Sequence, residues 1–425
     1  MNKTDFPLSV RDGENAMHSS TRKSLSIQDY YRGKTVLITG CTGFIGSILL
    51  TIILAKLPDV RRVYCLYRTQ PGIKDPRAQW IKGDICNRQW GLEAGAYARI
   101  CAEVEVIFHL AAHTGWDIGL NEQVASNTLP VLYGAALASD CRKLESFVVT
   151  SSYWAAFHLA HAGEIGETIF QDYRAEAELA EILQRQSFAR LAEWPNPYSY
   201  SKNLAERLLH QRYPHLPVIL ARVTSAGATW AFPHRGLCQF KNALPAFLRA
   251  IVKGRAHYFP IEMKTAINDA IPADICANIL LTNAADRAGE PFSVIHCGSA
   301  NRNLPTLGAI AEMAGPIRYM DSAEDINQLL SGLPNQRIAS FNKLLLETYG
   351  AGLDRRVVFL DHHARRPLER MSLHELEQFP IDVGCVDWHQ LVAAMVGTLR
   401  GGKRSEDYPL PGTLGNSHVS LAEPV

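Results

Sequence analysis

Short apolar runs alternate with helical stretches along the first half of the chain. Five runs have the length and the β-branched or aromatic content of strands, and they span residues 35–38, 62–68, 80–85, 104–112 and 146–152. Between them lie segments of helical length, of which residues 48–54 are almost entirely apolar. This alternation predicts an α/β fold with a doubly wound, Rossmann-type parallel sheet, whose ligands bind at the carboxyl ends of the strands.

The alternation weakens beyond about residue 223, where Pro, Gly and aromatic residues become more frequent. We therefore expect a nucleotide-binding core at 27–222 and a smaller C-terminal, substrate-binding part at 223–400 with segments that return to the core. The polar ends, residues 1–26 and 401–425, are expected to be disordered tails. No stretch predicts a bilayer-spanning helix, although peripheral membrane contact stays open.

Composition excludes several classes of protein. The 425 residues carry 43 basic and 42 acidic side chains, so the net charge of +1 gives no global reason to expect nucleic acid as a partner. Nine cysteines are scattered without a C-x-x-C pair, which indicates neither a disulfide framework nor a zinc site. We expect a reducing, cytoplasmic location and no metal.

The first strand is followed by glycines spaced G-x-x-G-x-x-G, at the point where the strand should turn into a helix. Glycine allows a tight turn and close approach to phosphate, while the helix N-terminus offers free N–H groups and a positive dipole end. An ordinary strand–helix turn is the alternative. The candidate dinucleotide-binding residues here are Thr39, Gly40, Thr42, Gly43, Phe44, Ile45 and Gly46.

Other strand ends suggest how the cofactor is selected. Arg68 ends the second strand, where an acidic residue would favour NAD and an arginine accommodates a 2′-phosphate, so we predict NADPH. Asp84 can accept a hydrogen bond from adenine, with Ile85 beside it. The small residues Ala111 and Ala112 would let the backbone lie close to the ribose-phosphate chain.

Tyr198 and Lys202 are the candidate catalytic pair. They are four residues apart, so on a helix they share one face, and the ammonium should lower the pKa of the phenol from about 10 toward neutrality. Ser152 ends a strand with three hydroxyls and could hold a carbonyl oxygen beside the phenol. We expect Ser151, Tyr198 and Lys202 to contact the cofactor as well.

With these residues the chain resembles the extended short-chain dehydrogenase/reductases, and within them the fatty acyl-CoA reductases and related thioester reductases. The similar stretches run in order from about residue 27 to 400, and include 106–112, 195–206, 269–274, 296–301 and 379–388. The resemblance implies catalytic roles for Ser152, Tyr198 and Lys202, and a proton-relay role for Asn127. Consecutive serines leave open whether Ser151 or Ser152 is the catalytic hydroxyl.

The resemblance implies NADPH-dependent reduction of a fatty acyl thioester, carried by CoA or an acyl carrier protein, to an aldehyde and on to a primary alcohol. Two alternatives stay open: a nucleotide-sugar epimerase or dehydratase with the same motifs, and a non-catalytic NADPH-binding protein. The sequence determines neither acyl chain length, carrier, final product nor oligomeric state.

One segment breaks the even distribution of charge. Residues 207–261 contain no Asp or Glu but carry eight Lys and Arg residues. Following the catalytic helix, the segment could steer CoA phosphates or an acidic carrier protein, and a solvated basic face is the alternative.

Overall fold

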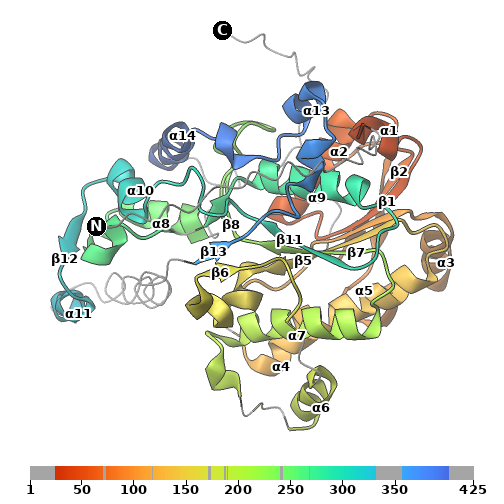
Figure 1. Cartoon of the computed structure of the whole chain (residues 1–425), viewed down its shortest axis with the longest axis horizontal. Coiled ribbons are helices and arrows are strands. Elements are labelled where there is room, and N and C mark those ends of the chain that lie inside the picture. The colour runs from red at the N-terminus through yellow and green to blue at the C-terminus, as the bar shows by residue number, and fades with distance from the viewer. Residues whose placement is uncertain are drawn as a thin grey trace, which may run out of the picture.

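The computed structural model describes residues 24–69, 73–116, 118–170, 174–185, 188, 190–239, 243–267, 269–331 and 357–401. A seven-stranded parallel sheet lies at its centre (Figure 1). Across the sheet the strands are β11 (Ser293–Cys297), β7 (Val218–Val223), β5 (Ser146–Ser152), β4 (Val106–His109), β1 (Thr35–Thr39), β2 (Arg62–Tyr67) and β3 (Ala78–Lys82). This confirms the predicted doubly wound sheet. Its strand order reverses between β1 and β4, where such sheets bind ligands at the carboxyl ends.

Helices cover both faces of the sheet, as Figure 1 shows. One face carries α1 (Ile27–Tyr31), α2 (Phe44–Lys56) and α9 (Ala273–Asp286), and the other carries α3 (Ala94–Glu103), α5 (Leu129–Asp140) and α7 (Pro197–Arg212). Alternate residues of β1 enter opposite cores: Val36 and Ile38 pack on the α2 side and Leu37 on the α3 side. α2 packs both on the sheet and against the neighbouring helix α9, which itself contacts β5, β7 and β11, so apolar residues are buried on several sides of α2.

Further short elements flank the α7 face. They are α4 (Leu120–Gln123), a π-helical turn (Val124–Thr128), α6 (Ala175–Arg185) and the 3₁₀ helices η1 (Arg88–Gly91), η3 (Tyr153–Ala162) and η4 (Leu191–Glu193). α6 and α4 both pack against α7. They lie on its side away from the sheet (Figure 1).

A smaller lobe extends from the carboxyl end of the sheet, on the left of Figure 1. Its helices are α8 (Ala243–Val252), α10 (Leu307–Ala314), α11 (Ala323–Ser331) and α14 (Trp388–Arg400), with η5 (Ile261–Lys264). Two short parallel pairs support it, β8 (Ser225–Ala226) with β10 (Ala270–Ile271) and β9 (Tyr258–Pro260) with β12 (Arg318–Met320). A third pair, β6 (Glu164–Ile165) with β13 (Val358–Phe359), ties the late chain to η3; α13 (Leu373–Gln378), η6 (Arg366–Glu369) and η7 (Val383–Cys385) complete the fold.

The later half also returns to the core, since β11 pairs with β7 and α9 packs on α2. The expected tails, 1–26 and 401–425, lie mostly outside the described residues, at 1–23 and 402–425. Leu25 and Ser26 correct the N-terminal boundary. The N–H of Leu25 donates to Arg370 and its side chain is buried, while Ser26 caps α1.

Within the described ranges, no helix has both the length and the apolar character needed to cross a bilayer.

Candidate active site

The chain turns sharply where β1 ends and α2 begins. Gly40 adopts φ +74°, and a Cβ on it would lie 2.7 Å from the backbone nitrogen of Ala111. A Cβ on Gly46 would lie 2.1 Å from the carbonyl oxygen of Gly40. Because the first N–H groups of a helix have no intrahelical acceptor, this turn presents donors and a positive dipole end. These residues fit a dinucleotide pyrophosphate.

Side chains around the turn serve mainly to hold it. The Thr39 hydroxyl accepts the N–H of Ala111 at 3.2 Å and lies 2.9 Å from Nδ1 of His109, on the adjacent strand. Burial, with the charge of Lys202, lowers the pKa of His109 to about 3, so its ring is neutral. Phe44 is buried in the core, so only its N–H can face a phosphate. The Ala111 backbone is thereby fixed against the glycine turn.

A cavity of about 530 Å³ lies at the ends of β2 and β3 and brings together two residues predicted to bind the adenosine half. Arg68 and Asp84 both line this cavity. Ile85 instead packs against the hydrophobic core on the face of the sheet that carries α3 and α5. Arg68 is exposed, and no carboxylate pairs with it in the part of the chain that the structure describes. Lys82 and Arg99 also line the cavity, and sequence reasoning missed them. The sequence could have indicated Lys82 as a cavity residue, because it directly precedes the Gly83–Asp84 pair at the end of a predicted strand.

The proposed catalytic hydroxyls meet at the end of β5. Tyr198 is buried on α7, and its phenol lies close enough to the Ser152 hydroxyl for that hydroxyl to lower its pKa. The Ser152 hydroxyl also accepts the N–H of Trp154 at 3.3 Å. Ser151 instead donates to Oε1 of Glu206 at 2.5 Å. The structure therefore places Ser152, not Ser151, beside the tyrosine.

The expected lowering of the tyrosine pKa is wrong for this structure. Burial raises the pKa of Tyr198 above its ordinary value, and the nearby Ser152 hydroxyl only partly opposes this. The ammonium of Lys202 is directed elsewhere, since it donates to the carbonyl oxygen of Thr150 at 3.3 Å. The phenol consequently keeps its proton at neutral pH and is available as an acid.

Lys202 lies one helical turn beyond Tyr198 and is 4% exposed. Burial lowers its pKa to about 8, and the charge of Glu206 opposes that effect. Glu206 is itself held by the guanidinium of Arg222, which is fully buried and lies 2.7 Å away. Arg222 also donates to Thr168 and contacts His296. The sequence analysis did not predict this buried network of Glu206, Arg222 and His296, because its members are far apart in sequence.

These pKa shifts predict an alkaline limit to activity. Lys202 is protonated below pH 8 and loses its charge above it, while Tyr198 keeps its proton through this range because its pKa is raised. We expect kcat/KM for reduction to fall as pH rises through about 8. Glu206→Gln removes the opposing charge, so the fall should begin at lower pH in a variant shown to be folded by circular dichroism. A profile that is flat to pH 10, or unmoved in Glu206→Gln, would contradict this assignment.

Asn127 lies in the π-helical turn that joins α4 to α5. Its amide oxygen accepts the N–H of His113 at 2.9 Å, and its amide nitrogen donates to the carbonyl of His113 and to Gln123. π-Helical turns often occur at functional sites. The side chain holds the loop after β4 in place, and the proton-relay role of Asn127 stays a prediction.

Internal pairing accounts for part of the basic segment. Arg207, Arg212 and Arg222 pair with Glu178, Glu176 and Glu206, respectively. Arg249 and Lys253 are exposed at the end of α8. Of the basic segment 207–261, which was proposed to steer an anionic carrier, Arg249 and Lys253 thus remain exposed on the smaller lobe, whereas Arg207, Arg212 and Arg222 pair with glutamates.

The fold, the glycine turn and the Ser152–Tyr198–Lys202 set define an extended short-chain dehydrogenase/reductase. Residues 38–75 and 72–280 match the family model described as "Male sterility protein". The chain belongs to that family.

Two curated relatives illustrate the similarity. Fatty acyl-CoA reductase 2 of Bos taurus is 26% identical over 309 residues, which make up 65% of this chain and 60% of that protein. Probable fatty acyl-CoA reductase 5 of Arabidopsis thaliana is 25% identical over 361 residues, or 69% of this chain and 72% of that protein. This chain thus spans less than two thirds of the bovine relative.

Solved structures share the fold. The terminal R domain of the myxalamid PKS-NRPS biosynthetic pathway superposes with a TM-score of 0.65 at 18% identity, covering 88% of this chain and 92% of that one. The reductase domain of a non-ribosomal peptide synthetase from Mycobacterium tuberculosis gives 0.59 at 19% identity, covering 86% and 91%. The doubly wound core and the attached lobe are therefore a shared architecture.

Proposed function

We propose that this protein reduces a fatty acyl thioester to an aldehyde, and in a second round to a primary alcohol, with NADPH as the reductant. The observation that carries the proposal is the buried Tyr198 phenol, which lies beside Ser152 and is followed one turn later by Lys202. It lies at the carboxyl edge of the same sheet as the glycine turn. The names of the curated relatives support an acyl thioester as the substrate.

A bound nicotinamide dinucleotide supplies the hydride that reaches the carbonyl carbon. Ser152 and Tyr198 hold the carbonyl oxygen, and Tyr198 transfers its proton to that oxygen, which leaves a hemithioacetal and a phenolate. Lys202, one helical turn away with its ammonium held at the carbonyl of Thr150, offsets the phenolate charge through space rather than by a direct hydrogen bond. The phenolate then takes back the hydroxyl proton while the carbon–sulfur bond breaks, so aldehyde and thiolate leave.

Arg68 supports NADPH as the form of the cofactor, because it is exposed in the cavity that also contains Asp84. Arg68→Ala should weaken NADPH binding by roughly 10- to 100-fold and NADH binding far less, since the charge-assisted contact exists only with the 2′-phosphate. Calorimetric titration with both cofactors measures this difference. Equal losses for NADPH and NADH would show that Arg68 does not select the phosphate.

The carrier and the location are part of the same proposal. The exposed Arg249 and Lys253 support a phosphate-bearing carrier, either CoA or an acyl carrier protein. All nine cysteines are free thiols, which is compatible with a reducing compartment, and we propose the cytoplasm.

The decisive experiment follows NADPH oxidation by the full chain with acyl-CoAs and acyl carrier proteins of graded chain length. Products are identified by mass spectrometry. The proposal expects one NADPH per aldehyde or two per alcohol, with release of free thiol. Conversion of a nucleotide sugar without net NADPH oxidation would instead identify an epimerase or dehydratase.

A further inference from the structure

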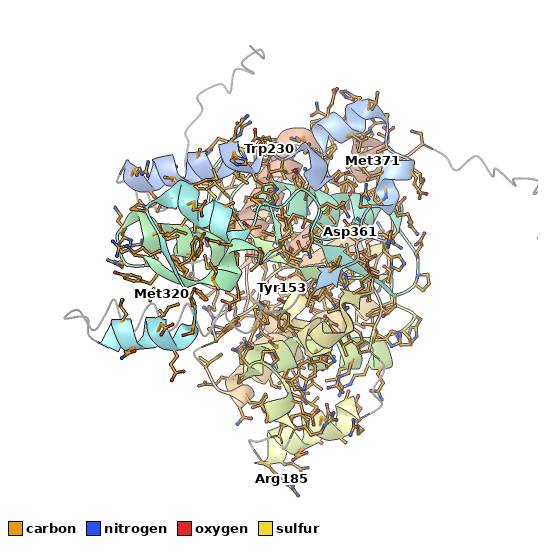
Figure 2. The ribbon with its side chains drawn as sticks, turned by 60° about the vertical axis from the view of Figure 1, so that its left-hand side comes forward. Tyr153, Arg185, Trp230, Met320, Asp361 and Met371 are labelled. Atoms are coloured by element: carbon orange, nitrogen blue, oxygen red, sulfur yellow. The ribbon has the colours of Figure 1, made fainter. Side chains whose placement is uncertain are left out.

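An aromatic cluster begins directly at the proposed catalytic hydroxyl. Since Ser152 caps η3 and accepts the N–H of Trp154, the first residues beyond the hydroxyl are held rather than free. Those residues are Tyr153 and Trp154, both half-buried. Tyr153 lies near the middle of the molecule in Figure 2, between the lobe that contains Met320 and the α6 end marked by Arg185.

Residues distant in sequence complete the cluster. Trp116, in the loop after β4, meets Trp154 edge to face, with ring centroids 5.1 Å apart and planes at 85°. Trp154 packs on Phe157 at 4.5 Å, and Tyr153 meets Phe359 of β13 at 5.5 Å. Phe157 and Phe359 are buried, so they form the base on which the outer rings rest.

The outer edge of this cluster faces solvent. Trp116 is 38% exposed, which makes it one of the few exposed large apolar side chains among the described residues. Exposed aromatic surface on a supported base is typical of a binding site rather than of a folding core. Its loop continues from Ala111, whose backbone is fixed against the glycine turn. The two tryptophans thus come from two segments, one after β4 and one after β5, that meet beside Ser152.

Position and chemistry together select the occupant. Trp154 lies only two residues beyond Ser152. The part of the substrate that contacts Trp154 is therefore a group attached directly to the reacting carbonyl carbon. One attached group is the thiol arm of the carrier, which in pantetheine is rich in polar amides, and the other is the acyl chain. The cluster of Trp116, Tyr153, Trp154, Phe157 and Phe359 contains no charged side chain. Such a surface suits methylene groups.

We propose that Trp116 and Trp154 form the wall along which the substrate's acyl chain lies, and that this wall makes the protein prefer long acyl chains over short ones. This inference rests on the proposed acyl thioester reduction. The rigid edge-to-face pair offers a preformed apolar surface, so each additional methylene that reaches it leaves water.

The test compares chain-length dependence in Trp116→Ala with that of wild type. Because Trp116 is part of the exposed edge, its removal should leave the fold intact, which circular dichroism can check. We expect KM to rise about tenfold for palmitoyl thioester and to change less than twofold for butyryl thioester, a loss equivalent to contact with about two methylenes. Leu373→Ala, at a leucine that is 81% exposed on α13, is the matched control and should change neither KM.

A binding readout separates the wall from catalysis. Palmitoyl thioester should quench tryptophan fluorescence of the cofactor-free protein, and Trp116→Ala should lose most of that change. If wild type reduces long acyl thioesters but Trp116→Ala keeps their preference over short ones, the wall assignment is overturned and the proposed function stands. If wild type reduces no acyl thioester of any length, the proposed function fails and this inference fails with it.

Discussion

Tyr198→Phe should lower the rate of thioester reduction by about 100- to 10,000-fold, the usual contribution of a positioned proton donor. The substitution removes one buried hydroxyl beside Ser152, and it leaves the ring and the helix in place. Since the phenol is not among the groups proposed to receive the phosphates, NADPH affinity should stay within about threefold of wild type. Single-turnover kinetics and a fluorescence titration with NADPH measure the two quantities.

Tyr200→Phe is the matched control for this experiment. Tyr200 lies two residues further along α7, and its buried hydroxyl donates to Glu178 at 3.0 Å. Losing that bond should reduce the free energy of unfolding by about 1–2 kcal/mol without a comparable change in the chemical step. If Tyr198→Phe keeps wild-type turnover, or if both variants lose activity equally, Tyr198 is not the acid.

Gly46→Ala should abolish measurable dinucleotide binding. A Cβ at this position would lie 2.1 Å from a backbone oxygen and 2.7 Å from a backbone carbon of Gly40, which cannot move like a flexible side chain. The turn must therefore open, and its N–H groups lose the arrangement that receives phosphate. We expect at least a 100-fold rise in the Kd for NADPH by calorimetry, and a lower melting temperature from the overpacked turn.

Alanine substitutions at two other glycines serve as controls for Gly46→Ala. A Cβ on Gly43 would meet the same oxygen at 3.1 Å, so Gly43→Ala should cause a smaller loss. Gly95 lies in α3, where a Cβ would meet only the guanidinium of Arg99, at 3.8 Å, and alanine should stabilise the helix slightly. Weaker binding in Gly95→Ala than in Gly46→Ala, or wild-type binding in Gly46→Ala, would contradict the proposed phosphate site.

Local patterns were sufficient for the central parts of the fold. The β-branched runs and the glycine spacing depend on neighbours within a few residues, so they predicted β1, α2 and the turn between them. The four-residue interval between Tyr198 and Lys202 likewise placed both on α7. The two strands that complete the sheet, β7 and β11, were missed as a pair because the chain leaves the sheet between them to form β8, α8, β9, β10 and α9.

The electrostatics of the site depended on burial, which the sequence does not display. Proximity of a lysine suggested that the pKa of Tyr198 would fall, yet the enclosed environment raises it. The basic segment similarly appeared continuous along the chain, whereas Arg207 and Arg222 turn inward to Glu178 and Glu206. Desolvation and pairing across elements decided both results.

The sequence by itself determined the class of the sheet, the glycine turn and the spacing of the phenol and the ammonium, because each rests on local geometry. Only the tertiary structure decided which serine lies beside Tyr198, since the choice depends on how β5 meets α7: Ser151 reaches Glu206 and Ser152 reaches the phenol. It also brought Trp116 against Trp154. Such contacts join segments that are dozens of residues apart, and only the packing of strands and helices sets their register.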